Sequence, residues 1–141
     1  MEKENIAFQN STVLAYIGDS VYELHIRKHV MKAGQTNADR LHQTAVRFVR
    51  AEAQAAALKN LLAELTEEEL ALVKRARNKK SATKPKNADP VEYKWATAFE
   101  ALIGYLYLSD NIERLNEIIE KAIEFTERSK GNHYVRKKVS E

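Results

Sequence analysis

The sequence contains no cysteine, so disulfide bonds, thiolate metal sites and cysteine nucleophiles are excluded. Only four glycines and two prolines interrupt the 141 residues, while alanine, leucine, glutamate and lysine are frequent. This composition favours helices over sheets. No apolar run approaches the length of a membrane span, and the polar first ten residues lack the apolar core of a signal peptide. We therefore expect a soluble, cytoplasmic, all-α protein that has no membrane contact.

Apolar residues recur at helical spacing in five segments, and an alternating strand pattern is missing. The five stripes are Val13, Leu14, Ile17, Val21 and Leu24; Leu41, Ala45, Phe48, Val49 and Ala56; Leu65, Leu70 and Val73; Trp95, Ala98, Leu102, Ile103 and Leu106; and Ile112, Leu115, Ile118, Ile119 and Ala122. Together with the capping signals, they predict about five main helices.

Four positions carry the chemistry of a helix start. Thr66 with a glutamate three residues later is a capping box, and Asp89 followed by Pro90 combines a capping side chain with the residue that best suits a first helical turn. Thr36 and Asp110 are also followed by an acidic residue at the third position. We expect helices to begin after each of these residues.

Two apolar helical segments each carry one acidic residue and one glycine. Asp19 follows Gly18 in the first segment, and Glu100 precedes Gly104 by four residues in the second. A carboxylate among core residues is costly unless it is paired or bound to a metal. If the two glycines let their helices cross closely, Asp19 and Glu100 would meet, and two convergent carboxylates with room for water suit Mg²⁺. Either segment alone is more typical of a capped or salt-bridged acid.

Between these two segments lies a stretch without acidic residues, from residue 70 to residue 88. Its second half lacks apolar periodicity and predicts a basic loop. A solvated loop is the alternative interpretation, because basic runs often serve only solubility. We nevertheless assign RNA binding to five of its cations, namely Arg77, Lys79, Lys80, Lys84 and Lys86. A second basic cluster lies in residues 131–141, which we expect to form a C-terminal tail.

Three segments in this order resemble a known family. Ile17–Val21 is similar to the signature of the ribonuclease III catalytic domain, and Phe99–Gly104 is similar to that family's second acidic motif. The segment Arg77–Asp89 and the short chain resemble one branch, the Mini-ribonuclease III enzymes. The resemblance implies a helical, dimeric catalytic domain, which we assign to residues 1–130. It also implies hydrolysis of double-stranded RNA with Mg²⁺, for which Mn²⁺ can substitute, and maturation of precursor 23S ribosomal RNA.

The resemblance implies that Asp19 and Glu100 are the catalytic, metal-binding carboxylates. The family usually has glutamates where this chain has Thr12 and Ala15, and an aspartate where it has Thr97. A weaker and more water-ligated Mg²⁺ site is therefore expected. Thr97, and Glu23 one turn after Asp19, remain candidates for supporting the metal ligands. No segment resembles a separate RNA-binding domain, so duplex affinity is expected from the lysines of each subunit in the homodimer.

Two other functions compete with the nuclease prediction. The missing acids also suit a catalytically weak or inactive dimeric module that binds double-stranded RNA. A helical DNA-binding or protein-interaction domain would explain the basic stretch, although no helix-turn-helix pair is visible. His25 and His29 share one helical face but lack a zinc motif, and we expect them to be structural.

Overall fold

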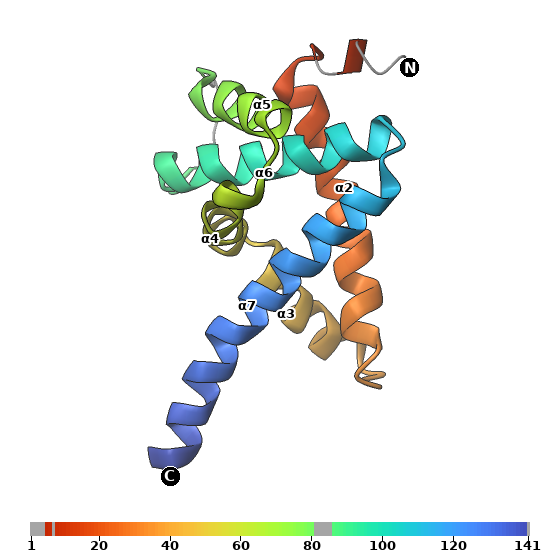
Figure 1. Cartoon of the computed structure of the whole chain (residues 1–141). Coiled ribbons are helices and arrows are strands. Elements are labelled where there is room, and N and C mark those ends of the chain that lie inside the picture. The colour runs from red at the N-terminus through yellow and green to blue at the C-terminus, as the bar shows by residue number, and fades with distance from the viewer. Residues whose placement is uncertain (1–4, 7, 81–85, 141) are drawn as a thin grey trace.

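The computed structural model describes the backbone of residues 5–6, 8–80 and 86–140, and the side chains of these residues up to 129. Six α-helices and one 3₁₀ turn follow one another from residue 11 onward: α2 (Ser11–Met31), α3 (Ala38–Val49), α4 (Ala51–Leu61), η1 (Leu62–Glu64), α5 (Glu67–Asn78), α6 (Pro90–Leu108) and α7 (Ile112–Ser140). The described residues contain no strand, which confirms the all-α prediction (Figure 1).

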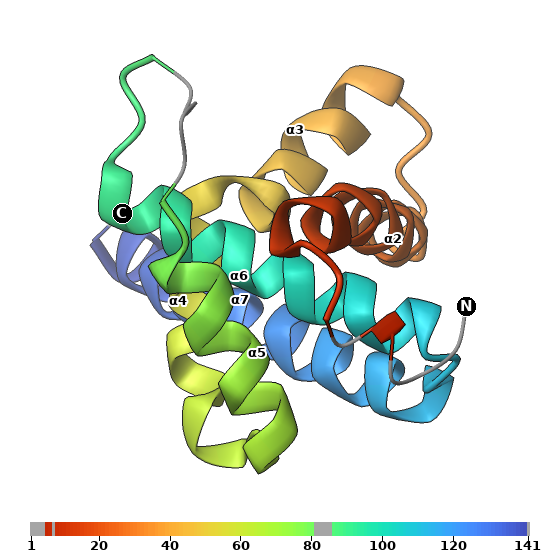
Figure 2. The ribbon, with the colours of Figure 1, turned by 90° about the horizontal axis from the view of Figure 1, so that it is seen from above.

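Helix α6 is the centre of the fold. It packs against α2, α4, α5 and α7, which surround it in both views of the ribbon (Figures 1 and 2). Every residue from 101 to 106 is buried. A helix that is apolar on all sides is stable only when neighbours cover all of it. The sequence of α6 therefore dictates its central place.

The second predicted helix is in fact two helices. The chain breaks at Arg50, whose extended backbone (φ −65°, ψ 152°) ends α3 and begins α4. No glycine or proline marks this break, and the apolar spacing continues across it. The sequence therefore predicted one helix where the structure has two. Ala56 of the predicted stripe is consequently exposed, while its neighbours Ala55 and Ala57 are buried.

Helix α2 is apolar on more than one face. Val13 and Leu24, which the periodicity assigned to the core, are 52% and 60% exposed. The buried face contains Leu14 and Val21, as predicted, together with Tyr22 and Ile26, which the stripe did not include. The prediction was wrong for Val13 and Leu24 because a helix with apolar residues on two faces gives no single stripe by which to choose the core side.

Two of the predicted helix starts are confirmed. The Thr66 hydroxyl accepts a hydrogen bond from the Glu69 amide at 3.1 Å, and the Glu69 carboxylate accepts one from the Thr66 amide at 2.9 Å. Asp89 caps α6 by accepting from the Val91 amide at 2.8 Å, and Pro90 occupies the first helical position. These starts were predictable because both partners lie within three residues of each other.

The other two predicted starts were wrong by one residue or more. Asn37, rather than Thr36, caps α3 by accepting from the Arg40 amide at 3.1 Å. Asp110 has a left-handed backbone (φ 61°), and α7 begins only at Ile112. Asn has a stronger preference than Thr for the capping position.

Helix α7 runs as one element from Ile112 to Ser140. The boundary that we placed between residues 130 and 131 falls inside it and stays a prediction. Within the described part of the chain, every helix is too short or too polar to span a bilayer.

Candidate active site

The crossing of α2 and α6 is built on two glycines. A Cβ atom on Gly18 would lie 1.8 Å from the backbone oxygen of Glu100, and one on Gly104 would lie 2.0 Å from that of Leu14. Neither position accepts a side chain without moving a helix backbone. The predicted close approach is thereby confirmed, and both glycines are required by contact rather than by backbone conformation.

This crossing brings Asp19 and Glu100 together, and their side chains share a hydrogen bond. On the core side of the pair, the rings of Tyr22 and Phe99 meet edge to face with centroids 4.8 Å apart. Asp19 is exposed, so the expectation that it lies among core residues was wrong. Glu100 is partly buried. One carboxylate therefore faces solvent and the other lies at the edge of the core.

The surroundings of Glu100 disfavour its ionised form. Burial, the hydrogen bond with Asp19 and the negative charge of Asp19 raise the pKa of Glu100 to about 9, and a hydrogen bond from Gln54 opposes them. No described lysine or arginine forms an ion pair with either acid. The pair needs a shared proton or a cation to remain together.

The two acids fit a divalent metal with an open, hydrated shell. Among the residues that the structure describes, no cluster of three His, Cys, Asp or Glu side chains is arranged to hold a metal. Mg²⁺ does not require one, because it commonly binds one or two carboxylates together with waters and substrate phosphates. Asp19 and Glu100 would be the protein ligands of such an ion.

Gln54 of α4 is a member of this site that the sequence did not reveal. Its side chain is 2% exposed and donates a hydrogen bond to the Val49 carbonyl at 2.9 Å, and its interaction with Glu100 lowers the pKa of that carboxyl. A glutamine within the alanine-rich segment Ala51–Ala57 matches no motif. Only the fold shows that it faces the acidic pair.

The sequence matches the Ribonuclease III domain model over residues 12–111, which include both acidic motifs. The chain belongs to the ribonuclease III family. Its curated relatives include the Mini-ribonuclease 3 of Symbiobacterium thermophilum, which is 48% identical over 82% of this chain and 88% of its own length. That of Brevibacillus brevis is 47% identical over 90% and 98%.

A crystal structure of a Fusobacterium nucleatum protein agrees with this fold. The two chains are 36% identical and superpose with a TM-score of 0.75, covering 83% of this chain and 93% of the other. The relatives place the chain in the Mini-ribonuclease III branch and thereby confirm the resemblance. The protein is an endoribonuclease, from a family that acts on double-stranded RNA.

Two of the positions at which this chain lacks family acids now surround a small cationic pocket. Thr12 and Thr97 line a cavity of about 70 Å³ together with Lys79 and Lys94. The Lys79 ammonium donates to the Asn10 side chain, and to the Thr12 hydroxyl at 3.3 Å. Thr97 donates back to a carbonyl of its own helix at 2.9 Å. The described lining of this pocket thus contains two lysines and no carboxylate.

The remaining predicted RNA-binding residues differ in their surroundings. Lys79, Lys80 and Lys86 are exposed, and Lys84 lies outside the described residues. The Arg77 guanidinium instead lies 4.9 Å from the centroid of the Trp95 ring. Such stacking stabilises α5 against α6.

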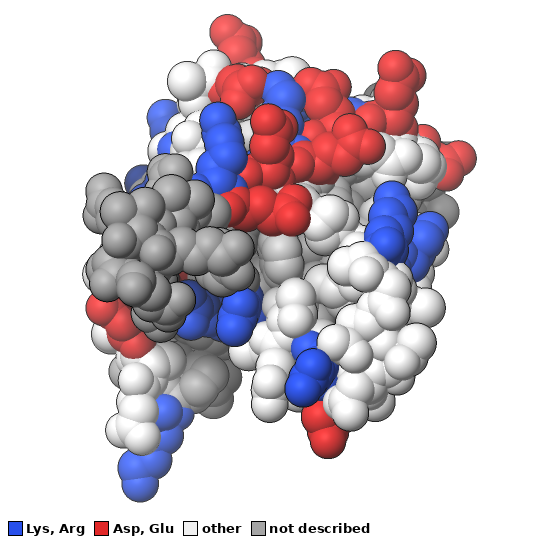
Figure 3. Space-filling model, turned by 90° about the horizontal axis from the view of Figure 1, so that it is seen from below, with Lys and Arg blue, Asp and Glu red and all other residues white. Residues whose placement is uncertain are grey.

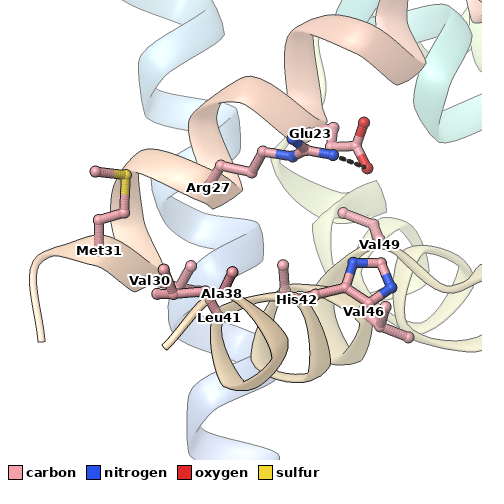
Figure 4. Close-up of a pocket in the computed structure, with 10 residues that line it drawn as sticks. Glu23, Arg27, Val30, Met31, Ala38, Leu41, His42, Val46 and Val49 are labelled. Atoms are coloured by element: carbon pink, nitrogen blue, oxygen red, sulfur yellow. Dashed lines mark ion pairs between the residues drawn. The ribbon is translucent and has the colours of Figure 1, made fainter. Parts of the chain in front are cut away.

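Glu23, predicted to support the metal ligands, forms an ion pair within its own helix. Its carboxylate pairs with Arg27 at 3.5 Å, at the edge of a pocket of about 280 Å³ between α2 and α3 (Figure 4). His29, on the same helix, pairs with Glu127 at 3.3 Å and contacts the Phe48 ring edge to face. These contacts hold α2, α3 and α7 together.

A second buried acid belongs to α5 and pairs with an arginine of α7. Glu69 of α5 is 4% exposed, and both of its carboxylate oxygens accept hydrogen bonds from Arg114 at 2.8 and 2.9 Å. Arg114 also reaches Glu117 at 2.8 Å.

Exposed glutamates lie near Glu69 and Arg114 in the sequence: Glu64, Glu67, Glu68, Glu113 and Glu120. Figure 3 shows acidic side chains gathered along one edge of the face seen from below, an edge that would repel RNA.

Proposed function

We propose that this protein is a Mg²⁺-dependent endoribonuclease that cleaves double-stranded RNA at the Asp19–Glu100 pair, with Mn²⁺ as a possible substitute. The observation that carries the proposal is the contact of the two carboxylates across the glycine crossing, where no described cation neutralises them. Glu69 shows how this fold treats a structural acid, because arginine accompanies it. A pair of acids without such a partner is typical of a site that receives its cation from outside.

The two carboxylates would approach a metal ion from different sides. Asp19 is exposed and offers an oxygen on the side from which an RNA backbone can approach. Glu100 is held at the crossing and would bind the metal from the protein side. When bound, Mg²⁺ would supply the Lewis acid that lowers the pKa of an attacking water and offsets charge on the scissile phosphate. Attack of the water oxygen on phosphorus would break the bond from phosphorus to the 3′ oxygen, which takes up a proton from solvent, so that a 5′-phosphate and a 3′-hydroxyl result.

RNA binding is assigned to the lysines that follow α5. The Lys79 ammonium contacts Thr12 at the start of α2. Thr12 is seven residues, or about 10 Å along the helix, from Asp19. Double-stranded RNA is recognised through phosphates and 2′-hydroxyls, which suits lysine ammonium groups. Lys79→Ala should weaken duplex binding and lower the slope of log K against log salt by about 1. An unchanged slope would remove Lys79 from the RNA contact.

We further propose that two copies form a homodimer through the outer face of α2. Four apolar side chains there are exposed, Tyr16 at 81%, Met31 at 61%, Leu24 at 60% and Val13 at 52%. Exposed apolar patches of this kind mark interfaces. Asp19 lies on the same helix, so pairing through this face would place two sites along one duplex, one for each strand.

Sedimentation of charged variants tests the dimer. Leu24→Asp should convert the protein to a monomer, whereas Tyr107→Asp, at a side chain 45% exposed on α6, should not. A dimer that survives Leu24→Asp would exclude this face.

The natural substrate that we propose is precursor 23S ribosomal RNA in the cytoplasm, in keeping with the branch to which the relatives belong. Mapping of 23S ends in cells that lack the gene and are complemented with wild type or Glu100→Gln tests it. Unprocessed ends should accumulate only with the variant.

The first experiment is cleavage of a labelled RNA duplex over a range of Mg²⁺ concentrations, by the wild type, Asp19→Asn and Glu100→Gln. A metal ion contributes several kcal/mol to such reactions, so each variant should lose about 1,000-fold or more in rate. Binding of the duplex should survive in both.

The alternative function has its own outcome in this experiment. Binding without cleavage by the wild type, at any Mg²⁺ or Mn²⁺ concentration, would indicate an inactive RNA-binding module. The replacement of family acids by Thr12, Ala15 and Thr97 is the feature that favours this alternative.

A further inference from the structure

We infer that Gln54 is a positioning residue of the nuclease site, whose buried amide fixes the Glu100 carboxylate for metal binding. The inference rests on the proposed function, because it gives Glu100 the role of metal ligand. It adds a third helix to the site, since Gln54 belongs to α4 while Asp19 and Glu100 belong to α2 and α6.

The hydrogen bonds determine which way the amide points. The Nε2 atom of Gln54 donates to the Val49 carbonyl at 2.9 Å, and the side chain lies close enough to Glu100 to favour its ionised form. Ionised Glu100 is an acceptor as well, so the second hydrogen of the NH₂ group is the one available to it. The reversed amide would place its oxygen against two other oxygens. The orientation is therefore set by the surroundings rather than chosen freely.

The break between α3 and α4 supplies one of these acceptors. Carbonyls of the last helical turn have no partner within their own helix, and Val49 is the last residue of α3. The extended Arg50 leaves this carbonyl facing α4, where the Gln54 side chain reaches it. A feature that looked like an irregularity of the fold thus anchors the amide that holds Glu100.

Packing alone does not account for a glutamine here. Its side chain is 2% exposed, and Ala55 and Leu58 beside it are buried as well. Burial of an amide is unfavourable unless its polar atoms find partners, and an apolar side chain would fill the same space at less cost. The position of Gln54 beside Glu100 explains why an amide side chain occupies this buried site. Partners that orient a ligating carboxylate commonly contribute 10- to 100-fold, so about that factor is expected in metal affinity.

The test is the affinity for Mn²⁺, measured on the full chain without RNA by calorimetry and by electron paramagnetic resonance. Gln54→Leu removes the amide but keeps the approximate volume. Thr126→Val is the matched control, because Thr126 is a buried polar residue of α7 whose hydroxyl donates to the Ala122 carbonyl of the same helix at 2.9 Å. Gln54→Leu should bind Mn²⁺ about 10- to 100-fold more weakly than the wild type, and Thr126→Val should bind it normally.

A double-mutant cycle separates positioning from a general structural effect. In a Glu100→Gln background, Gln54→Leu should cause no further loss of Mn²⁺ affinity, because its effect passes through Glu100. Duplex affinity, measured in EDTA, should be the same in the wild type and in Gln54→Leu. If Gln54→Leu does not fold, Gln54→Met, an unbranched side chain of similar length, replaces it throughout.

The opposite results would exclude either the positioning role of Gln54 or the ligand role of Glu100. Wild-type Mn²⁺ affinity in a folded Gln54→Leu protein, or equal losses in Gln54→Leu and Thr126→Val, would exclude the positioning role. Wild-type Mn²⁺ affinity in Glu100→Gln would instead reject Glu100 as a ligand, and with it the proposed metal site. The two failures are therefore distinguishable in one set of titrations.

Discussion

Glu69 on α5 and Glu100 on α6 are both withdrawn from water, but Glu69 lies beside a positive charge and Glu100 beside a negative one. Glu69 is clasped by Arg114 at 2.8 Å. Glu100 meets another acid, Asp19, and an uncharged amide, Gln54. Burial disfavours the ionised form of both. The difference lies in whether the fold supplies a cation.

The pKa values follow from this difference. Burial raises the pKa of Glu69, but hydrogen bonds from Arg114 and Thr66 outweigh it, so the pKa falls below its ordinary value. For Glu100, burial and Asp19 act in the same direction, and the pKa rises to about 9. A buried acid with arginine stabilises the fold. A buried acid beside another acid destabilises it, which is typical of functional sites.

The largest expected effect comes from disturbing the crossing that places Glu100 beside Asp19. Alanine normally stabilises a helix relative to glycine by about 1 kcal/mol. At Gly18 its Cβ would lie 1.8 Å from a backbone oxygen. Overpacking against a backbone should make Gly18→Ala less stable by about 3 kcal/mol or more. Urea unfolding measures the loss, and a more stable variant would show that the helices are free to separate.

A second glycine provides the matched control. Gly34 has a positive φ of 85° but open space around it. Gly34→Ala should therefore lose only about 1 kcal/mol, through backbone strain. It should leave RNA cleavage unchanged.

Removing the paired acid is the next largest effect. Glu69→Ala would take the partner from an arginine whose side chain is 17% exposed. Breaking a buried pair typically costs 3–5 kcal/mol, and the exposure of Arg114 places this pair at the lower limit, about 3 kcal/mol. The melting temperature should fall by about 10 °C. Cleavage at low temperature should persist, and its loss would connect Glu69 to the reaction.

Much of the fold could be predicted because its signals are local. The cap at Thr66 and the start at Asp89–Pro90 involve partners a few residues apart, and both are confirmed. The break at Arg50 could not be predicted, because packing rather than a helix-breaking residue sets it. The pairing of Glu69 with Arg114 spans 45 residues of chain and leaves no pattern in the sequence.

The site was partly predictable because an acid and a glycine stand close together in each of two apolar segments. Gly18 and Gly104 indicated a close crossing, and Asp19 and Glu100 do meet there. Gln54 was missed because its role depends on where α4 lies against α6, which no spacing within α4 reveals.

Removing Glu100, the acid without an arginine partner, should change stability less than removing Glu69 does. The change should have the opposite sign. In EDTA, Glu100→Gln relieves both the burial of a carboxylate and its repulsion by Asp19. The free energy of unfolding should rise by about 1 kcal/mol, while cleavage in Mg²⁺ is lost. Urea unfolding of the variant beside the wild type measures the gain. A loss of stability would mean that Glu100 is held as favourably as Glu69, and the contrast between them would disappear.

The smallest expected effect is the contribution of Glu69 to the pH dependence of stability. Because the pKa of folded Glu69 is depressed below its ordinary value of 4.5, its contribution is present above that pH and is lost as the pH falls through the lower, folded-state value. Glu69→Gln should therefore flatten the fall in melting temperature below pH 4.5, and should leave the profile between pH 5 and 7 parallel to that of the wild type. Glu120→Gln, at an exposed acid of α7, is the control and should follow the wild type throughout. Equal slopes in Glu69→Gln and the wild type below pH 4.5 would show that Arg114 does not favour the ionised carboxylate. Glu69 would then lose the property that distinguishes it from Glu100.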